Sequence, residues 1–353
     1  MKAAFVKDAS EGGGVELRDV ERPPLTPGSI IVKLKASGVC GTDLEKLTGR
    51  NITTAILGHE VSGIITESDS DTYPVGSRVV PHHHVACGEC ILCKAGAGTM
   101  CAGFKASNFV PCGFSEEFLV PSYNVENGGV HFIQDNLSYE EASIAEPLAC
   151  CIRGLNRVVK GKWLEPDGYT PSILVVGAGP IGILLMELLK SRNLSTKMVA
   201  ADISMTRLEF ARKFEGAETV EVGGSTGGLF ANDAISRTAE GRGFDLVIVA
   251  TGAQSAFAEA AKCVAKSGTL LLFGAPHKGA TFNLDLAKLF LHEVTITTSY
   301  SALDTEISEA LGMLESGDID ARNLITAKYP LAQIAEAMRA AHNENQVKVI
   351  VAD

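Results

Sequence analysis

The sequence is poor in positive charge and has no long apolar run. Lys and Arg together number 31 against 42 Asp and Glu, which gives a formal net charge of −11. A chain with this balance is not expected to bind the phosphate backbone of a nucleic acid. No run of about 18 uncharged apolar residues is present, so no membrane span is predicted. The net charge does not argue against a small-molecule partner. Because the first residues lack the apolar core of a secretory signal, we expect a cytoplasmic protein.

Cysteine, by contrast, is plentiful and its spacing is informative. Of nine cysteines, four form the pattern Cys87-x2-Cys90-x2-Cys93-x7-Cys101. Disulfides in a secreted chain are the alternative, but without a secretory signal metal binding is the better interpretation. Four thiolates this close in sequence can surround one tetrahedral Zn²⁺ and leave no position open for substrate. The pattern predicts a closed, structural zinc site in a lobe at residues 87–101.

The length and the hydrophobic pattern predict two domains. Residues 1–150 contain short apolar stretches separated by turns rich in Pro, Gly and Asp, which indicates a β-rich domain. From Ser172 onward, apolar strands alternate with helical patterns, as in a doubly wound parallel α/β sheet. The strands are expected at 172–177, 198–202, 220–222, 244–250, 269–274 and 294–300. A helix around 307–314 and a strand at 347–351 are expected near the end.

A glycine-rich motif follows the strand at 172–177. The motif Gly177-Ala-Gly179-Pro-Ile-Gly182 opens an amphipathic helix, and Asp202 stands twenty residues after its last glycine. This context predicts a dinucleotide site with the pyrophosphate at the helix N-terminus. Asp202 is expected to accept hydrogen bonds from the adenosine ribose, which favours NAD over NADP. NADP stays an alternative, because the nearby Arg207 could bind its 2′-phosphate. The candidate cofactor residues here are Gly177, Gly179, Pro180, Ile181, Gly182, Asp202 and Arg207.

A third set of candidates is spread along the first domain. It consists of Cys40-Gly-Thr42-Asp43, Gly58-His59-Glu60 and Ala145-Glu146-Pro147. A thiolate, an imidazole and carboxylates form a workable ligand set for a zinc that keeps an exchangeable position. The spacing alone does not decide between metal binding and simple packing, because a single Cys or His is more often packed than ligating.

Taken in order, these motifs resemble the zinc-containing medium-chain dehydrogenase/reductase family, which includes alcohol, sorbitol and threonine dehydrogenases. The resemblance covers nearly the whole chain. It implies a GroES-like catalytic domain at 1–150, a Rossmann NAD-binding domain at 151–300 and a return of 301–353 to the first domain, with the active site in the cleft between domains. It also implies two zinc ions per chain and places Thr251, Phe273 and Ser299 on strands that line the cofactor.

The resemblance assigns the metal ligands residue by residue. Cys40 and His59 match direct ligands of the catalytic zinc. Glu146 matches the glutamate that replaces a second cysteine in the sorbitol and threonine branch. Glu60 matches a glutamate that lies beside the metal and moves into coordination.

The proton path is assigned only in part. Asp43 matches a carboxylate bonded to the ligand histidine, which fixes its tautomer. Thr42 matches the hydroxyl that contacts the substrate oxygen and starts proton release. Glu45 and Lys46 depart from the family pattern, because relatives often place a histidine or tyrosine there. The rest of the relay therefore stays open.

Other reactive residues receive less specific roles. The three histidines at 82–84 adjoin a lobe whose thiolates already saturate one zinc, so we assign them surface or hydrogen-bonding roles. Cys150 and Cys151 fit an apolar helix face as small buried hydrophobes. Cys112 stands between a proline and a glycine in a loop, and whether it faces the cleft stays open.

The resemblance implies an oxidoreductase in which zinc acts as a Lewis acid on the substrate hydroxyl and a hydride moves to the nicotinamide. Glutamate in place of cysteine leaves a harder metal, which suits a substrate with neighbouring hydroxyls, so a polyol or sugar alcohol is expected first. A threonine-type amino alcohol and a simple alcohol are the alternatives. A non-catalytic relative is disfavoured because Cys40, His59 and Thr42 are all present. A homodimer or homotetramer is expected.

Overall fold

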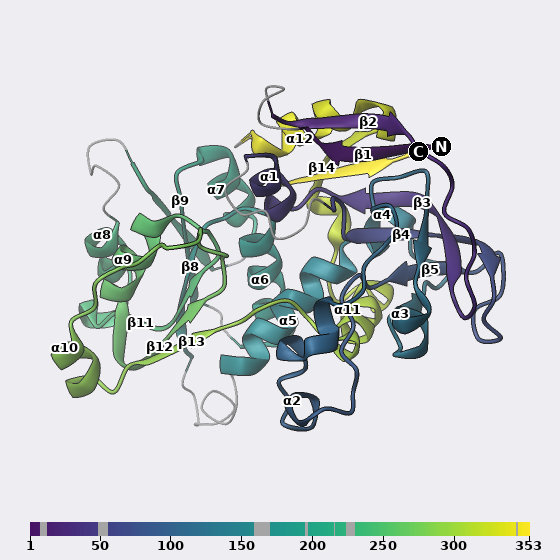
Figure 1. The fold of residues 1–353 in the computed structure, drawn as a ribbon. Coiled ribbons are helices and arrows are strands. Elements are labelled where there is room, and N and C mark those ends of the chain that lie inside the picture. Colours follow the sequence, from purple (N-terminus) through teal and green to yellow (C-terminus); the bar gives the residue numbers. More distant parts are fainter. Residues whose placement is uncertain are drawn as a thin grey trace. The chain divides into compact units, whose positions relative to one another are not determined.

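A computed structural model describes residues 1–7, 13–48, 56–158, 170–194, 197–214, 216–223, 230–343 and 345–353. The chain divides into two compact units. Unit 1 comprises Met1–Ala149 and Ser301–Asp353, and unit 2 comprises Cys150–Tyr300. Figure 1 follows the chain through both. In the described segments, no helix has the length and apolar character needed to cross a membrane.

Unit 1 is built mainly on antiparallel strands. Among its described residues, seven strands form one sheet in the order β14-β15-β3-β4-β5-β7, with β6 paired to β3, while β1 and β2 pair separately. Both chain segments contribute to this sheet, because β15 pairs with the end of β3. The strand bounds are β1 Lys2–Val6, β2 Val15–Asp19, β3 Ile30–Gly38, β4 Glu60–Ser68, β5 Arg78–Pro81, β6 Glu117–Val120, β7 Val130–Phe132, β14 Ile325–Tyr329 and β15 Lys348–Ala352.

The side-chain alternation of β3 explains its central place in unit 1. Ile30, Val32 and Leu34 point to one face of the sheet, as residues two apart do on a strand. There they join a buried cluster that includes Ile65 of β4 and Phe118 of β6. The helices of this unit are α1 Gly41–Leu47, α2 Ile91–Lys94, α3 Ser122–Glu126, α4 Tyr139–Ala142, α11 Asp304–Ser316 and α12 Ile334–His342, with short 3-10 turns η2 Gly98–Met100, η3 Ala102–Lys105, η6 Ala321–Asn323 and η7 Leu331–Gln333. Helix α5, Ala145–Val158, begins in unit 1.

Unit 2 is a parallel sheet with helices between its strands. In the described residues, six strands lie in the order β10-β9-β8-β11-β12-β13, and every pair is parallel. The order reverses at β8, which is the switch point where doubly wound sheets bind ligands. The predicted α/β fold class is confirmed. The bounds are β8 Ser172–Val176, α6 Pro180–Ser191, β9 Lys197–Asp202, α7 Met205–Ala211, β10 Ala217–Glu221, α8 Ala231–Ser236, η5 Ala239–Gly241, β11 Phe244–Val249, α9 Gln254–Lys262, β12 Val264–Leu272, α10 Leu286–Leu291 and β13 Thr295–Thr298.

Candidate active site and metal centres

The four cysteines of the lobe come together in the structure. Their Sγ atoms are 3.4 Å apart for Cys87 and Cys101, 3.5 Å for Cys90 and Cys93, and 3.9 Å for Cys87 and Cys93. All four sulfur atoms lie within 4.8 Å of one another. A tetrahedral zinc with bonds of about 2.3 Å holds its sulfur ligands roughly 3.8 Å apart. The cluster therefore fits a closed zinc site.

The first turn of α1 positions Cys40 and Asp43. Cys40 precedes the helix, and its backbone N–H donates to Oδ2 of Asp43 at 3.2 Å. This bond satisfies an N–H that a helix start leaves without an intrahelical partner. Asp43 is fully buried, whereas Thr42 in the same turn is exposed. The turn thus leaves the Cys40 thiol and the Thr42 hydroxyl accessible, with a carboxylate beneath them.

His59 is held between Gly58 and Asp43. Gly58 has a φ of +77°, and a Cβ there would lie 2.6 Å from the backbone nitrogen of Phe114, so only glycine fits. Its N–H donates to Oδ1 of Asp43 at 3.1 Å, and the same oxygen lies 3.5 Å from Nδ1 of His59. Nε2 of His59 faces Oγ1 of Thr42 at 3.5 Å. With Nδ1 directed at a carboxylate, Nε2 is the nitrogen available to a metal.

The surroundings of His59 favour the positively charged form of its ring. Burial acts against a charged His59 ring, but Asp43 and Cys40 outweigh it and raise the pKa of His59 well above its ordinary value. Burial alone would raise the pKa of Asp43, because it disfavours the charged carboxylate. The nearby His59 ring outweighs burial and lowers that pKa. A field that stabilises a positive charge at this ring also suits a bound cation.

The two departures from the family pattern, Glu45 and Lys46, lie in α1. Nζ of Lys46 donates to the carbonyl of Ile56 at 2.6 Å and lies 3.9 Å from Oδ1 of Asp43. Lys46 therefore supports the segment that leads to His59. Glu45 is half-buried on the same helix.

Glu60 starts β4 and belongs to a compact group of potential ligands. Cys40, His59 and Glu60 each offer a ligand atom within 4.8 Å of the others, and we call them the first ligand group. Glu60 is 1% exposed and forms an ion pair with Nζ of Lys348, itself 3% exposed. Nζ of Lys348 also donates to the carbonyl of Val39 at 3.1 Å. Burial lowers the pKa of Lys348, but Glu60 and Cys40 outweigh it and raise that pKa.

Glu146 lies in the first turn of α5 and joins a second set of donors. Its carboxylate and the ring nitrogens of His82 and His83 offer atoms within 4.8 Å of one another, and we call these three residues the second ligand group. Burial raises the pKa of Glu146, against an opposing effect of the His59 ring. The ring centroids of His59 and His83 are 5.1 Å apart, so the two ligand groups adjoin.

The surface role considered for the histidines at 82–84 is wrong for two of them. His82 is 1% exposed and His83 is 8% exposed, while His84 is half-buried. The backbone explains this, because the N–H of His82 donates to the carbonyl of Gly129 at 2.8 Å and Asn124 donates to the carbonyl of His82 at 2.8 Å. These bonds fix the backbone of the run against Asn124 and Gly129. A hydrogen-bonding role applies to His82, whose Nδ1 lies 3.0 Å from Oδ1 of Asp304.

The position of Cys112, which the sequence left open, is in the core. Cys112 is 1% exposed, and its Sγ lies 3.4 Å from the carbonyls of both Ala4 and Phe114. It packs in the core between β1 and the segment before β4, and burial raises the pKa of its thiol to about 12. Cys151 is fully buried as expected, and Cys150 is half-buried.

The donors around the two ligand groups suit zinc. Thiolate sulfur, imidazole nitrogen and carboxylate oxygen are the ligands that zinc takes in proteins. Within the described residues, Nε2 of His82 and Nδ1 of His83 are buried without a hydrogen-bond partner. Buried polar atoms seldom lack a partner in native proteins, so unpartnered nitrogen beside a buried carboxylate suits a bound metal or ligand.

The glycine motif joins β8 to α6 and is tightly packed. A Cβ on Gly182 would lie 1.9 Å from the carbonyl oxygen of Gly177, so a larger residue cannot be accommodated. Gly179 precedes α6, with Pro180 and Ile181 as its first two residues. The N-terminus of the helix therefore stands directly after β8, at the sheet's switch point. This arrangement suits a dinucleotide pyrophosphate.

Asp202 and Arg207 flank the glycine loop. Asp202 ends β9, where its Oδ2 accepts from the N–H of Ala178 at 2.6 Å and its Oδ1 from the N–H of Ser204 at 2.8 Å. Each carboxylate oxygen keeps lone-pair capacity for a further donor. A Cβ on Gly179 would lie 3.9 Å from a guanidinium nitrogen of Arg207, so this cation stands beside the loop.

The remaining cofactor candidates follow neighbouring strands. Thr251 comes two residues after β11. Phe273 comes directly after β12, and Ser299 directly after β13. Because these strands are parallel neighbours, their carboxyl ends share the edge that carries the glycine loop. The buried Oγ of Ser299 has no hydrogen-bond partner in the described segments.

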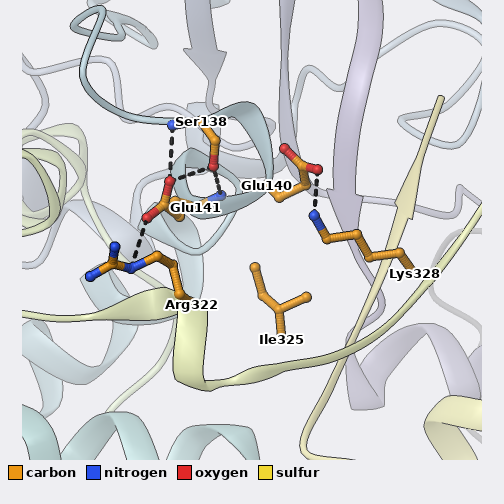
Figure 2. Close-up of a pocket in the computed structure, with 6 residues that line it drawn as sticks. All are labelled: Ser138, Glu140, Glu141, Arg322, Ile325 and Lys328. Atoms are coloured by element: carbon orange, nitrogen blue, oxygen red, sulfur yellow. Dashed lines mark hydrogen bonds and ion pairs between the residues drawn. The ribbon is translucent and has the colours of Figure 1, made fainter.

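A pocket of about 310 Å³ lies elsewhere in unit 1. Figure 2 shows its charged side chains turned toward each other. Lys328 is 2.6 Å from Glu140, and Arg322 is 3.7 Å from Glu141. None of the predicted site residues lines it, and its charges are satisfied within it, so we assign it no catalytic role.

Comparison with known proteins gives consistent matches along the chain. An alcohol dehydrogenase GroES-like domain matches residues 26–127, and a zinc-binding dehydrogenase domain matches residues 180–316. D-altritol 5-dehydrogenase of Agrobacterium fabrum is 34% identical, with 92% of each chain covered. L-threonine 3-dehydrogenase of Cutibacterium acnes is 30% identical, with 99% of this chain and 98% of the relative covered. The solved structure of 2R,3R-butanediol dehydrogenase from Bacillus subtilis is 26% identical and has a TM-score of 0.79. The match covers 100% of this chain and 99% of that one.

These matches extend over both units and define an oxidoreductase. The chain belongs to the zinc-containing medium-chain dehydrogenase/reductase family. The resemblance inferred from the sequence motifs is confirmed.

Proposed function

We propose that the enzyme is a zinc-dependent, NAD-linked dehydrogenase that oxidises a secondary hydroxyl of a polyol or sugar alcohol. The observation that carries the proposal is the first ligand group, in which Cys40, His59 and Glu60 offer a thiol, an imidazole and a carboxylate within 4.8 Å of one another. Asp43 behind the His59 ring directs Nε2 into this group.

Cys40, His59 and Glu146 would hold the catalytic metal, with Glu60 as a second carboxylate beside them. Zinc in that position supplies a Lewis acid that makes a substrate hydroxyl more acidic. Two carboxylates and one thiolate carry more negative charge than a divalent cation neutralises. Lys348 compensates one of these charges through its ion pair with Glu60. The pair thus limits the cost of burying several anions together.

Thr42 is the residue that we assign to the first proton transfer. Its hydroxyl lies 3.5 Å from Nε2 of His59, on the side of the ring that is available to a metal, and the side chain is exposed. A hydroxyl there can accept the substrate proton and donate its own proton to solvent. Positioned proton transfer of this kind typically contributes about 10²–10⁴-fold to a rate.

The proposed cofactor site is the loop Gly177–Gly182 with Asp202. NAD bound there supplies the hydride acceptor. The carboxylate of Asp202 would repel the 2′-phosphate of NADP, which supports NAD. Arg207 lies beside Gly179, where it can neutralise pyrophosphate charge without requiring a 2′-phosphate.

The substrate class rests on the relatives and on the donor set. The relative at 34% identity acts on D-altritol, as its name states, and this supports a polyol. Glu60 and Glu146 provide carboxylates, which make the metal harder than a second cysteine would and suit an oxygen-rich substrate. The relative at 30% identity, a threonine dehydrogenase, supports an amino alcohol as the second candidate.

The proposal is tested by measuring NADH formation with a panel of hexitols, pentitols, L-threonine and 2-butanol, and by counting zinc in the purified enzyme. We expect two zinc ions per chain and the highest kcat/KM with a polyol and NAD. A higher kcat/KM with L-threonine would replace the polyol by the amino alcohol. Zinc-free protein with full activity would contradict the metal assignment.

We further propose a cytoplasmic homodimer or homotetramer. The nine cysteines are all thiols in the structure, which suits a reducing compartment. Leu286, Phe290 and Leu291 of α10 are 76%, 83% and 73% exposed. Adjacent large apolar side chains at this exposure support a contact between copies of the chain. Light scattering after size-exclusion chromatography distinguishes these oligomers from a monomer.

A further inference from the structure

We propose that His83 determines substrate specificity by hydrogen-bonding the hydroxyl that neighbours the one being oxidised. This inference rests on the proposed polyol activity and states how that substrate class is recognised. It concerns a residue that the motif analysis left without a role in catalysis or binding.

The His83 ring is buried but incompletely satisfied. The residue is 8% exposed, and Nδ1 has no hydrogen-bond partner in the part of the chain that the structure describes. Its backbone is well anchored, since Nδ2 of Asn124 donates to the carbonyls of His82 and His83 at 2.8 and 3.3 Å. The chain is therefore held firmly here while the ring nitrogen is left available. An unmet buried polar atom in a well-anchored segment is best explained by a ligand.

The position of the ring points to the reacting substrate. One ring nitrogen of His83 lies within 4.8 Å of a carboxylate oxygen of Glu146. Its ring centroid is 5.1 Å from that of His59, and the ring of His84 packs against it at 3.9 Å. His83 thus adjoins two of the residues proposed to hold the metal. The hydroxyls of a vicinal diol are separated by about one hydrogen-bond length, so a substrate with one hydroxyl between these residues brings its neighbour toward His83.

His82 is the competing candidate, because its Nε2 also lacks a hydrogen-bond partner among the described residues. Its other nitrogen is engaged by Asp304 at 3.0 Å, and the same carboxylate oxygen lies 3.4 Å from Nε2 of His131. Asp304 begins α11, so His82 helps to join this helix to the sheet. His82 therefore has a structural role that explains its burial, whereas within the described residues no ring nitrogen of His83 makes such a contact.

A buried nitrogen of this kind produces selectivity. A substrate that supplies the second hydroxyl satisfies the nitrogen, whereas a monoalcohol leaves it buried and unpaired. Sites built to bind a hydroxyl reject analogues that lack it far more strongly than apolar pockets reject an extra group. We therefore expect the wild-type enzyme to prefer a polyol to 2-butanol, with a large part of the preference due to His83.

The test compares His83→Phe with wild type on a polyol and on 2-butanol under saturating NAD. Phenylalanine keeps the ring and removes its nitrogens. We expect kcat/KM for the polyol to fall about 10- to 100-fold, mainly through a higher KM, while the value for 2-butanol is unchanged or rises. His83→Gln should recover part of the polyol activity, because its amide can hydrogen-bond. His83→Gln also tests the inference if the His83→Phe protein does not fold. His84→Phe is the matched control and should behave as wild type.

Three results would overturn the inference. An equal loss on both substrates in a folded His83→Phe or His83→Gln protein would make His83 a structural residue. A fall in zinc content from two ions to one would make it a metal ligand. Failure of the proposed function looks different, because wild type itself would then show no preference for polyols. A wild type that prefers polyols, with an unaltered preference in His83→Phe, would overturn only the role of His83.

Discussion

Oδ1 of Asp43 lies 3.5 Å from Nδ1 of His59, while its Oδ2 accepts the N–H of Cys40 at 3.2 Å. One fully buried carboxylate thereby joins two segments, each of which contributes a proposed zinc ligand. The N–H of Gly58 donates to the same side chain at 3.1 Å. Asp43 therefore organises the proposed metal site without belonging to the first ligand group.

The first prediction concerns that carboxylate. Asp43→Asn keeps the size of the side chain but removes its charge, so the His59 ring loses the partner that orients it. Loss of such a partner typically weakens metal binding about 10–100-fold. Zinc content after dialysis against graded chelator should fall to one ion per chain at concentrations that leave wild type with two. The cysteine lobe provides the internal control, and identical curves for variant and wild type would contradict the role of Asp43.

The second prediction concerns the buried ion pair between Glu60 and Lys348. Lys348→Met leaves the Glu60 carboxylate without its counter-charge, which should cost about 3–5 kcal/mol of unfolding free energy in urea titration. The double variant Glu60→Gln/Lys348→Met should recover much of this loss. Because the pKa of Lys348 is raised above 10.5, the stabilisation is fully present below that pH and declines as pH rises beyond it. A single variant as stable as wild type would show that the pair contributes nothing.

The third prediction concerns cofactor choice. Asp202→Ala removes the carboxylate that is assigned to the adenosine ribose, so NAD binding should weaken by about 1–3 kcal/mol and the preference over NADP should narrow. Fluorescence titration with each reduced cofactor measures both effects. Because Asp202 also accepts from the N–H of Ala178 and the N–H of Ser204, thermal denaturation is the control for folding. A wild-type enzyme with higher kcat/KM for NADP would refute the role of Asp202.

The fourth prediction concerns the hydroxyl of Thr42. Thr42→Ala should lower kcat about 10²–10⁴-fold, the range for a positioned proton transfer, with a smaller effect on KM. Thr42→Ser keeps the oxygen and should retain much of the activity. Thr42→Val has nearly the shape of threonine without the hydroxyl, so it separates chemistry from packing. An active Thr42→Val enzyme under saturating NAD would leave Thr42 as a packing residue.

The features that the sequence predicts best depend on residues close together in the chain. The spacing of Cys87, Cys90, Cys93 and Cys101 brings four thiols together through one local lobe. The loop Gly177–Gly182 follows from the strand before it and the helix after it. Both patterns are therefore visible without knowledge of the tertiary structure.

The features that the sequence leaves out depend on long-range pairing or on weak patterns. Lys348 reaches Glu60 only because β15 pairs with the end of β3, and nothing in the closing strand marks it. The burial of His83 depends on Asn124, more than forty positions along the chain. For α12 a helical signal does exist, in the apolar spacing of Ile334, Ala337 and Met338, but it is short.

The most direct test of the account compares Cys40→Ser with Cys93→Ser for zinc content, folding and NADH formation from a polyol. Cys40→Ser should remain folded, hold one zinc per chain and be inactive, because only the proposed catalytic site is lost. Cys93→Ser should unfold or aggregate, because the lobe at 87–101 has little core of its own and depends on its metal. A Cys40→Ser enzyme that keeps both zinc ions and its activity would contradict the central claim.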